Sequence, residues 1–234
     1  MKAVILAGGK GRRLLPYTTN FPKPLMPIGE RPILEILLRQ LKQSGIEDII
    51  IATGYLEELI RAYFQDGERL RMKIRYSKEE EPLGTAGPLD LVRAELKDTF
   101  LMMNGDVLTD LSFQNLIEYH RSQEAVATVA VCRRTVHIDF GVVRFSEESA
   151  LCGWDEKPEI EYYVSTGIYV FDSQALELLP SKEFLNLPDF IMKLRHAKKK
   201  VVAYRHKGYW LDIGRPEDYE KACLESDKLV EGIS

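Results

Sequence analysis

The chain has 234 residues, of which 45% are hydrophobic and 29% charged, a balance typical of a globular protein that buries a substantial core. Its 32 basic and 36 acidic residues give a net charge of -4, which excludes the overall positive field of a nucleic-acid-binding protein. No apolar stretch approaches the length of a membrane span, so we expect a cytoplasmic protein with no membrane or nucleic-acid partner, folded as one domain over residues 1–234.

Strand-like and helix-like segments alternate through the first half of the chain. A continuous apolar run predicts a buried strand at 2–7, and apolar residues at helical spacing predict a helix at 32–45. The series continues with strands at 47–54, 72–77 and 99–106 and helices at 55–64, 86–96 and 113–121. This alternation is the pattern of parallel strands joined by crossover helices.

Longer β-rich segments follow, which predicts a mixed rather than a wholly parallel sheet. They lie at 125–133, 140–145 and 162–171, and the chain continues with helices at 174–179, 187–199 and 215–230 and a strand at 200–206. No linker or internal repeat divides the sequence, and it contains no hexapeptide repeat of a left-handed β-helix. The pattern predicts an α/β fold, a single-domain, Rossmann-like, three-layer αβα sandwich with a mixed, mostly parallel central sheet.

The first predicted strand ends in "AGGKGRR", a segment that combines glycines with cations. Gly8, Gly9 and Gly11 would let backbone N–H groups approach an anion, because no side chain stands in the way. Arg13, and Lys23 held between two prolines, are suited to neutralise phosphate charge. The spacing matches neither the dinucleotide fingerprint nor a P-loop, and the glycines alone would also suit a plain tight turn.

Two aspartates follow apolar segments, where a ligand crevice forms in parallel sheets. Asp106 ends the strand predicted at 99–106, and Asp212 lies between two apolar residues ahead of a glycine. Carboxylate oxygens are the ligands that Mg²⁺ prefers, so the pair would suit the counter-ion of a nucleoside triphosphate. Taken alone, each aspartate is more often a turn residue or a helix cap.

The segment "LAGGKGRRLLPYTTNFPKPLMPIGERPILE" resembles the N-terminal signature of the sugar-1-phosphate nucleotidylyltransferases, and further blocks extend the resemblance to about Ala222. Residues 82–87 are similar to the Pro-Leu-Gly-Thr-Ala-Gly block of the mannose-1-phosphate guanylyltransferase branch. Arg12 departs from the pattern, since the family more often has a small hydroxyl residue there. The resemblance implies an enzyme whose substrates are a nucleoside triphosphate and a sugar 1-phosphate, with Mg²⁺ as cofactor.

The resemblance also implies the roles of the residues around the glycine segment. Arg13, Lys23 and Asp106 would be catalytic: Arg13 would steady charge on the leaving pyrophosphate and Lys23 charge near the α-phosphate, and no protein nucleophile is required. Asp106 and Asp212 would hold the metal. The nucleotide would contact Leu6, Ala7, Gly8, Gly9, Gly11, Arg12, Arg13, Lys23, Glu81, Pro82, Gly84, Thr85, Asn104 and Gly105. The glutamates at 79–80 are interpreted as a solvated edge.

Three further blocks imply the sugar-phosphate end of the site. Glu156 and Lys157 in "WDEKPE" match the family's Glu-Lys-Pro, whose lysine meets the sugar phosphate and whose glutamate meets sugar hydroxyls. Gly141 in "DFGVVRF", and Thr166 with Gly167 in "VSTGIYVF", match blocks that lie against the sugar. Without the resemblance, the Glu-Lys pair would be an exposed ion pair in a surface turn and the first glycine an ordinary strand glycine.

The implied activity is transfer of a nucleoside monophosphate from GTP to mannose 1-phosphate, or to a related sugar such as a heptose 1-phosphate, with release of pyrophosphate. One open alternative is a cytidylyl- or uridylyltransferase that acts on an amino-sugar or a non-sugar phosphate. Another is a regulatory domain that binds nucleotide sugars without turning them over, although the presence of Arg13, Lys23, Asp106 and Asp212 speaks against it. The oligomeric state is open, with a homodimer among the options.

Overall fold

A seven-stranded sheet forms the centre of the molecule, whose computed structural model describes residues 1–225. The strand order is β12-β8-β11-β6-β1-β4-β5, and β11 runs antiparallel to both of its neighbours, whereas the other pairs in the sheet are parallel. The expectation of a mixed, mostly parallel sheet is therefore confirmed. The strands are β1 (Lys2–Ala7), β4 (Asp48–Thr53), β5 (Lys73–Lys78), β6 (Phe100–Asn104), β8 (Ala127–His137), β11 (Glu159–Phe171) and β12 (Val201–His206).

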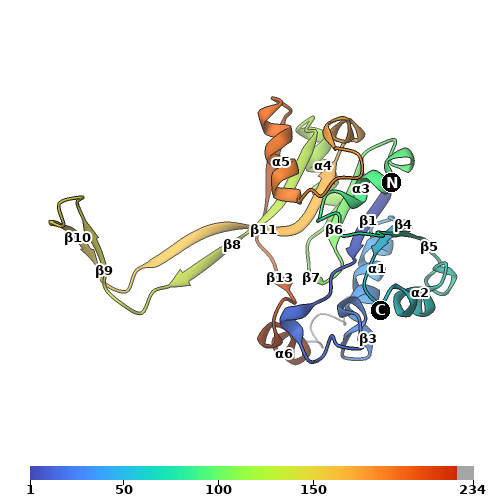
Figure 1. Cartoon of the computed structure of the whole chain (residues 1–234), viewed down its shortest axis with the longest axis horizontal. Helices are drawn as coiled ribbons and strands as arrows, with labels where there is room; N and C mark the ends of the chain where they lie inside the picture. The colour runs from blue at the N-terminus through green and yellow to red at the C-terminus, as the bar shows by residue number, and fades with distance from the viewer. Residues whose placement is uncertain (226–234) are drawn as a thin grey trace.

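Helices cover the two faces of the sheet and make three layers (Figure 1). They are α1 (Ile33–Gln43), α2 (Glu57–Phe64), α3 (Pro88–Leu91), α4 (Phe113–Ser122), α5 (Leu187–His196) and α6 (Pro216–Leu224). Ile5 of β1 packs in one buried cluster with residues of α1, α2 and α4, whereas its neighbour Val4 packs in a second cluster with residues of α3 and α5. Because both faces are buried, the strand has a continuous apolar sequence rather than an alternating one. None of the helices described is long and apolar enough to cross a bilayer.

Two predicted helices take another form in the structure, and a third is only partly described. The one expected at 86–96 stops after α3 and resumes as a 3-10 turn at Arg93–Glu95, because Val92 adopts a φ of -120° and Arg93 donates to the Leu179 carbonyl at 2.6 Å. The helix expected at 174–179 is a 3-10 helix, Ser173–Leu178. The helix expected at 215–230 is α6, and the end of that prediction lies outside the described residues.

Short strands join segments that are far apart in the sequence. They are β2 (Pro27–Ile28) with β3 (Arg31–Pro32), β7 (Val107–Thr109) with β13 (Trp210–Asp212), and β9 (Val142–Phe145) with β10 (Leu151–Asp155). The β7–β13 pair sets Asp212 opposite Val107, next in the chain to Asp106. The segment that carries Asp212 is thus paired with the strand that follows Asp106.

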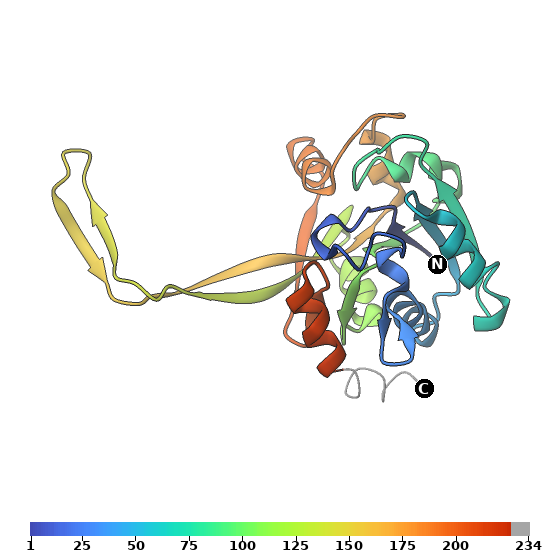
Figure 2. The same ribbon diagram turned by 60° about the horizontal axis from the view of Figure 1, so that its bottom comes forward.

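A two-stranded extension leaves the sheet on one side. β8 and β11 continue as a ladder beyond the other strands, and the β9–β10 hairpin forms its far end (Figures 1 and 2). We call residues 133–163 the arm and the rest of the described chain the body. The strands predicted at 125–133 and 162–171 are therefore longer than expected, because their outer halves pair with each other outside the sheet.

Candidate active site

The glycine segment after β1 forms one wall of a cleft at the carboxyl ends of the parallel strands. Gly11 adopts the left-handed conformation (φ 59°), and its carbonyl accepts hydrogen bonds from the Thr18 hydroxyl at 2.8 Å and the Leu14 N–H at 2.9 Å. A β-carbon on Gly9 would meet no atom within 4 Å, so this part of the backbone faces open space. The segment is a fixed loop whose exposed backbone is free to bind an anion.

Lys23 lies against this loop and is 8% exposed, in a 3-10 turn, Lys23–Leu25, that follows Pro22. Its Nζ forms an ion pair with Oδ2 of Asp106, which comes from the turn after β6. The other carboxylate oxygen, Oδ1, is buried and has no hydrogen-bond partner. An unsatisfied buried carboxylate oxygen is costly, and it is the kind of atom that a cation would stabilise.

Asp212 lies on the other side of the same space. Burial raises the pKa of its carboxyl, the negative charge of Asp106 adds to the rise, and Lys23 and Arg13 oppose it. A β-carbon on Gly214 would lie 3.2 Å from Oδ2 of Asp212 and 3.4 Å from Nη1 of Arg13, so glycine leaves room for both side chains. The structure thus brings two carboxylates and two cations together.

These carboxylates suit one kind of metal better than another. Among the described residues, no group of three or more His, Cys, Asp or Glu is arranged to hold a metal by itself. Mg²⁺ is commonly held by one or two carboxylates together with substrate phosphates and water, whereas a structural zinc needs four protein ligands. The partnerless oxygen of Asp106 and the raised pKa of Asp212 fit a divalent ion that is bound together with a phosphate ligand.

Two adjoining hollows lie along the cleft, of about 250 and 710 Å³, and they share Leu6, Gly9 and Asp106. Gly105 lies behind them, and its N–H donates to the Leu6 carbonyl at 2.9 Å. The other predicted nucleotide contacts all line one hollow or the other: Leu6, Ala7, Gly8, Gly9, Gly11, Arg12, Arg13, Lys23, Glu81, Pro82, Gly84, Thr85 and Asn104. The smaller hollow is lined by Arg12, Arg13 and Lys23, and the larger, which Lys10 and Lys78 also line, has room for a base and a sugar.

One detail of the larger hollow differs from the sequence interpretation. Glu79, interpreted as solvated, is half-buried in the lining, and its Oε2 accepts a hydrogen bond from the Leu83 N–H at 2.7 Å. Burial raises the pKa of this carboxyl, and the Leu83 N–H opposes the rise. Thr85 also lines this hollow, where its hydroxyl accepts the Leu187 N–H at 2.7 Å.

The missed glutamate could have been found by the rule that found Asp106, because it follows directly after β5. Phe184 and Asn186 also line the larger hollow, from the segment before α5. No pattern in their sequence indicates that these two residues line the hollow, since their position depends on how α5 packs against the sheet.

At the inner end of the predicted sugar site, Thr166 is 1% exposed and donates its hydroxyl to the Ala130 carbonyl at 2.9 Å. Its own carbonyl accepts the indole N–H of Trp210 at 2.8 Å. Gly167 has a φ of 75°, and a β-carbon there would lie 2.6 Å from Nδ2 of Asn104. Thr166 therefore holds the sheet to β13, and Gly167 makes room for a residue of the cleft.

The other predicted sugar-phosphate residues are not in this cleft. Gly141, Glu156 and Lys157 all lie on the arm, which stands away from the body in two views (Figures 1 and 2). The indole of Trp154 covers Gly141, where a β-carbon would lie 2.7 Å from the ring, and its N–H donates to Glu156 at 3.0 Å. Within one chain, the residues predicted to bind the nucleotide are thus apart from most of those predicted to bind the sugar phosphate.

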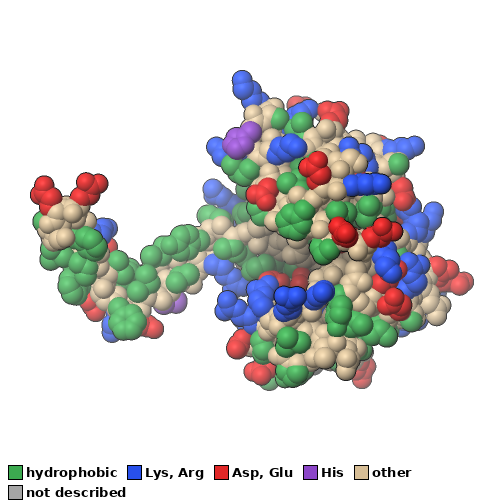
Figure 3. All heavy atoms as spheres, viewed as in Figure 1, with side chains coloured by type: hydrophobic (Ala, Val, Ile, Leu, Met, Phe, Trp, Pro, Cys, Tyr) green, Lys and Arg blue, Asp and Glu red, His purple; other side chains and the backbone are tan. Residues whose placement is uncertain are grey.

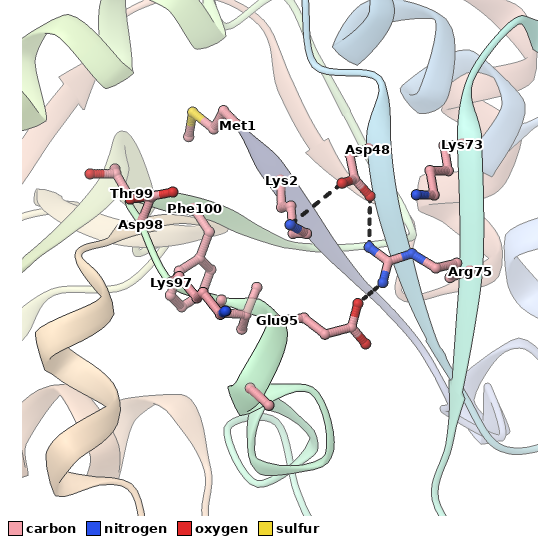
Figure 4. Close-up of a pocket in the computed structure, with 12 residues that line it drawn as sticks. Met1, Lys2, Asp48, Lys73, Arg75, Glu95, Lys97, Asp98, Thr99 and Phe100 are labelled. Carbon is pink, nitrogen blue, oxygen red and sulfur yellow. Dashed lines mark hydrogen bonds and ion pairs between the residues drawn. The ribbon is translucent and has the colours of Figure 1, made fainter.

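A further pocket lies at the opposite edge of the sheet, among the amino ends of the strands (Figure 4). Asp48 pairs there with Lys2 at 3.5 Å and with Arg75 at 2.7 Å, and Arg75 also pairs with Glu95. These charges neutralise one another and are partly exposed, so they form a solvated ion-pair face rather than an anion site.

Comparison with known proteins agrees with the geometry of the cleft. Residues 2–228 match the model of the nucleotidyl transferase family. The chain is 35% identical to a mannose-1-phosphate guanylyltransferase of Mycobacterium tuberculosis, covering 99% of this chain and 65% of the relative. It is also 35% identical to a UTP–glucose-1-phosphate uridylyltransferase of Synechocystis, covering 95% and 62%. The chain thus spans somewhat less than two thirds of the length of these relatives.

Solved structures show the same fold. A Bacillus anthracis protein assigned as a glucose-1-phosphate thymidylyltransferase aligns with a TM-score of 0.76 and 27% identity over 97% of this chain and 95% of that one. The HddC protein of Yersinia pseudotuberculosis, solved in complex with GMP-PN, aligns with a TM-score of 0.73 and 25% identity over 96% and 98%. With its glycine loop, paired cations and carboxylates at the ends of the parallel strands, the chain belongs to the nucleotidyl transferase family.

Proposed function

We propose that this chain transfers a nucleoside monophosphate from GTP to mannose 1-phosphate or a closely related sugar 1-phosphate, such as a heptose 1-phosphate, and releases pyrophosphate. The observation that carries the proposal is the Lys23–Asp106 pair beside the glycine loop, with one carboxylate oxygen buried and without a partner. A fixed cation and an unsatisfied carboxylate at an open backbone loop suit a triphosphate that arrives with a divalent ion. We also propose the cytoplasm as its compartment.

Each residue of the cleft would have a distinct task. A phosphate oxygen of the sugar 1-phosphate attacks the α-phosphorus, and the bond to the pyrophosphate breaks as the new one forms. Lys23 would hold negative charge at the α-phosphate, and Arg13, on the exposed side of the loop, would hold the leaving pyrophosphate. Because no covalent intermediate with the protein is needed, positioning and charge stabilisation supply the catalysis.

Asp106 and Asp212 would hold Mg²⁺ in this proposal. The ion would neutralise phosphate charge and make the α-phosphorus more susceptible to attack. The preference for guanine is supported by Glu79. The Leu83 N–H donates to Oε2 of this side chain and not to Oε1. A carboxylate oxygen at this edge of the cleft complements the N–H donors that guanine carries on its Watson–Crick edge.

A uridylyltransferase is the second candidate, because the Synechocystis relative is as similar to this chain as the guanylyltransferase is. A matrix of four nucleoside triphosphates against several sugar 1-phosphates, read by pyrophosphate release with Mg²⁺ present, separates the two. We expect the highest kcat/KM for GTP with a mannose-type sugar 1-phosphate, and loss of turnover with a chelator. Preference for UTP with glucose 1-phosphate would support the second candidate, and no turnover with any pair would contradict both.

A further inference from the structure

The inner part of the arm is a regular two-stranded ladder rather than a loose loop. Beyond the sheet, β8 and β11 pair residue by residue from Arg133 with Tyr163 to His137 with Glu159, and the Ile138 N–H then donates to the Pro158 carbonyl at 3.2 Å. The only register shift in this ladder lies between Ser165 and Tyr169, inside the body. At about 3.3 Å per residue, the ladder carries the β9–β10 hairpin about 15 Å or more from the sheet.

This geometry keeps the arm out of its own cleft. The β8–β11 ladder is regular from Arg133 to His137, so Lys157 could reach the glycine loop of the same chain only if the ladder broke these pairs or bent sharply at its base, where the register shifts between Ser165 and Tyr169. A group carried on a stiff projecting ladder can instead reach a neighbouring molecule without any change in the arm.

The arm also exposes more apolar surface than a chain that stays monomeric would be expected to show. Its large side chains are largely accessible: Phe140 is 78% exposed, Phe145 71%, Leu151 66% and Trp154 61%. Figure 3 shows apolar side chains along the arm and acidic groups at its far end. Over residues 133–163 the arm carries seven acidic side chains against four basic ones, and two of the basic ones, Arg133 and Arg134, lie at its base; between residues 139 and 161 only Arg144 and Lys157 are basic.

The surface beside the glycine loop of the body complements that of the arm. Leu15, Tyr17 and Phe21 are 54%, 52% and 42% exposed there. The exposed cations Lys10 and Arg12 lie on the same loop, and Figure 3 shows Lys and Arg gathered where the arm leaves the body. An apolar, acidic arm and an apolar, cationic loop match in chemistry, and the charge pairing would favour their encounter.

We propose that the arm of one copy docks on the cleft of a second copy and brings Lys157 and Glu156 to the sugar-phosphate end of that copy's site. The proposal rests on the proposed function, since it assigns these residues to the acceptor substrate. The length of the arm is comparable to the roughly 20–30 residues that each partner contributes to a standard interface. Two reciprocal arms would place more residues than that in the interface, as expected of a stable dimer.

Subunit complementation tests the proposal. One chain carries Asp106→Asn in the body and the other carries Lys157→Ala in the arm, and the two are co-expressed with different tags and purified as a heterodimer. If the arm acts in the partner's site, one of the two sites combines an intact body with an intact arm, and the heterodimer has about half the wild-type kcat/KM for the sugar 1-phosphate. If each arm serves its own chain, this kcat/KM stays at or below the mean of the two variant homodimers, which would overturn the proposal.

The mass of the protein gives a readout that does not depend on turnover. Light scattering should show a dimer for the wild-type chain and a monomer for the Phe145→Ser, Trp154→Ser double variant, with the melting temperature of the body unchanged. Met192→Ser, on the exposed surface of α5 (Met192 is 40% exposed), is the matched control and should remain a dimer. A monomeric wild-type chain, or a double variant that stays dimeric, would overturn the proposed interface. Absence of turnover with every substrate pair would contradict the proposed function, whereas these masses would still decide the interface.

Discussion

The loop side of the cleft and the arm hold their lysines in opposite ways. Lys23 is buried between prolines and fixed by Asp106, whereas Lys157 is exposed at the end of a ladder and has a φ of 45°. The first arrangement is preorganised for charge that develops at one place during a reaction. The second is suited to a group that is delivered from outside. The difference fits the proposal that the chemistry belongs to the body and that the arm recognises the second substrate.

Asp106→Asn should have the largest effect, because it removes a carboxylate charge at the proposed metal site and retains an oxygen that accepts from Lys23. We expect kcat to fall by about 10³-fold, in the range seen when preorganised charge is removed from an active site. Pyrophosphate release at saturating substrates measures it. Asp98→Asn, at the opposite edge of the sheet (Figure 4), is the control and should leave kcat unchanged. Activity within a few-fold of wild type in Asp106→Asn would remove the metal assignment.

Lys157→Ala should come next and should act on one substrate only. We expect the KM for the sugar 1-phosphate to rise about 10- to 100-fold, since a charge-assisted contact to phosphate contributes about 1.5–3 kcal/mol, while the KM for GTP stays the same. Lys198→Ala is a matched control, because Lys198 is an exposed lysine of the body with a similar backbone (φ 58°). A rise in the KM for GTP would show that Lys157 does not act on the sugar 1-phosphate alone.

Glu79→Gln should change selectivity rather than rate, since Glu79 lines the larger hollow, whereas Arg13 and Lys23 line the smaller one. Replacing one carboxylate oxygen by an amide nitrogen removes an acceptor for guanine, and we expect the preference for GTP over UTP to fall about 10-fold. The ratio of kcat/KM values for the two nucleotides measures this. Glu80→Gln, at the exposed neighbouring residue, should leave the ratio unchanged. If both substitutions act equally, the base is not recognised here.

The smallest effect on activity is expected from Glu35→Gln in α1, because Glu35 has no role in the proposed site. Burial disfavours its charge, but hydrogen bonds from Tyr63, Arg39 and Arg69 lower the pKa of Glu35 below its ordinary value of 4.5. Because the folded-state pKa is lowered, this carboxylate stabilises the fold above about pH 4.5 and the stabilisation is lost as the pH falls below that value.

At pH 7 Glu35→Gln should therefore lower the free energy of unfolding by about 1–2 kcal/mol, with kcat within twofold of wild type. Urea unfolding at pH 7 and at pH 3.5 measures the difference between the variant and the wild-type chain. The difference should shrink at the lower pH. A difference of equal size at both pH values would show that the contact acts through packing rather than charge.

Much of the sheet could be predicted because its strands are buried on both faces. Continuous apolar runs such as 2–7 and 47–54 give β1 and β4 to within one residue at each end. The short strands β7 and β13 could not be predicted, since three-residue strands have no period and form only because Asp106 and Asp212 are brought together by the rest of the fold. The direction of the arm could not be predicted either, because the same residues would form a ladder inside or outside the sheet.

The candidate site divides in the same way. The cations and carboxylates around the glycine loop could be assembled from the rule that parallel strands end at one edge, and the structure places Arg13, Lys23, Asp106 and Asp212 around one space. Glu79 was missed because a run of like charges usually indicates a solvated surface, and the hydrogen bond from Leu83 that fixes it is a property of the folded turn. Thr166 matches the expected block, but its hydroxyl is used by the backbone.

The most direct test of the central claim is a crystal structure of the chain with a non-hydrolysable GTP analogue and Mg²⁺. The account predicts that the phosphates contact the glycine loop and Lys23, that the ion contacts both Asp106 and Asp212, and that the guanine lies near Glu79. A nucleotide bound instead in the ion-pair pocket at the opposite edge of the sheet (Figure 4), or phosphates with no contact to the glycine loop, would contradict it.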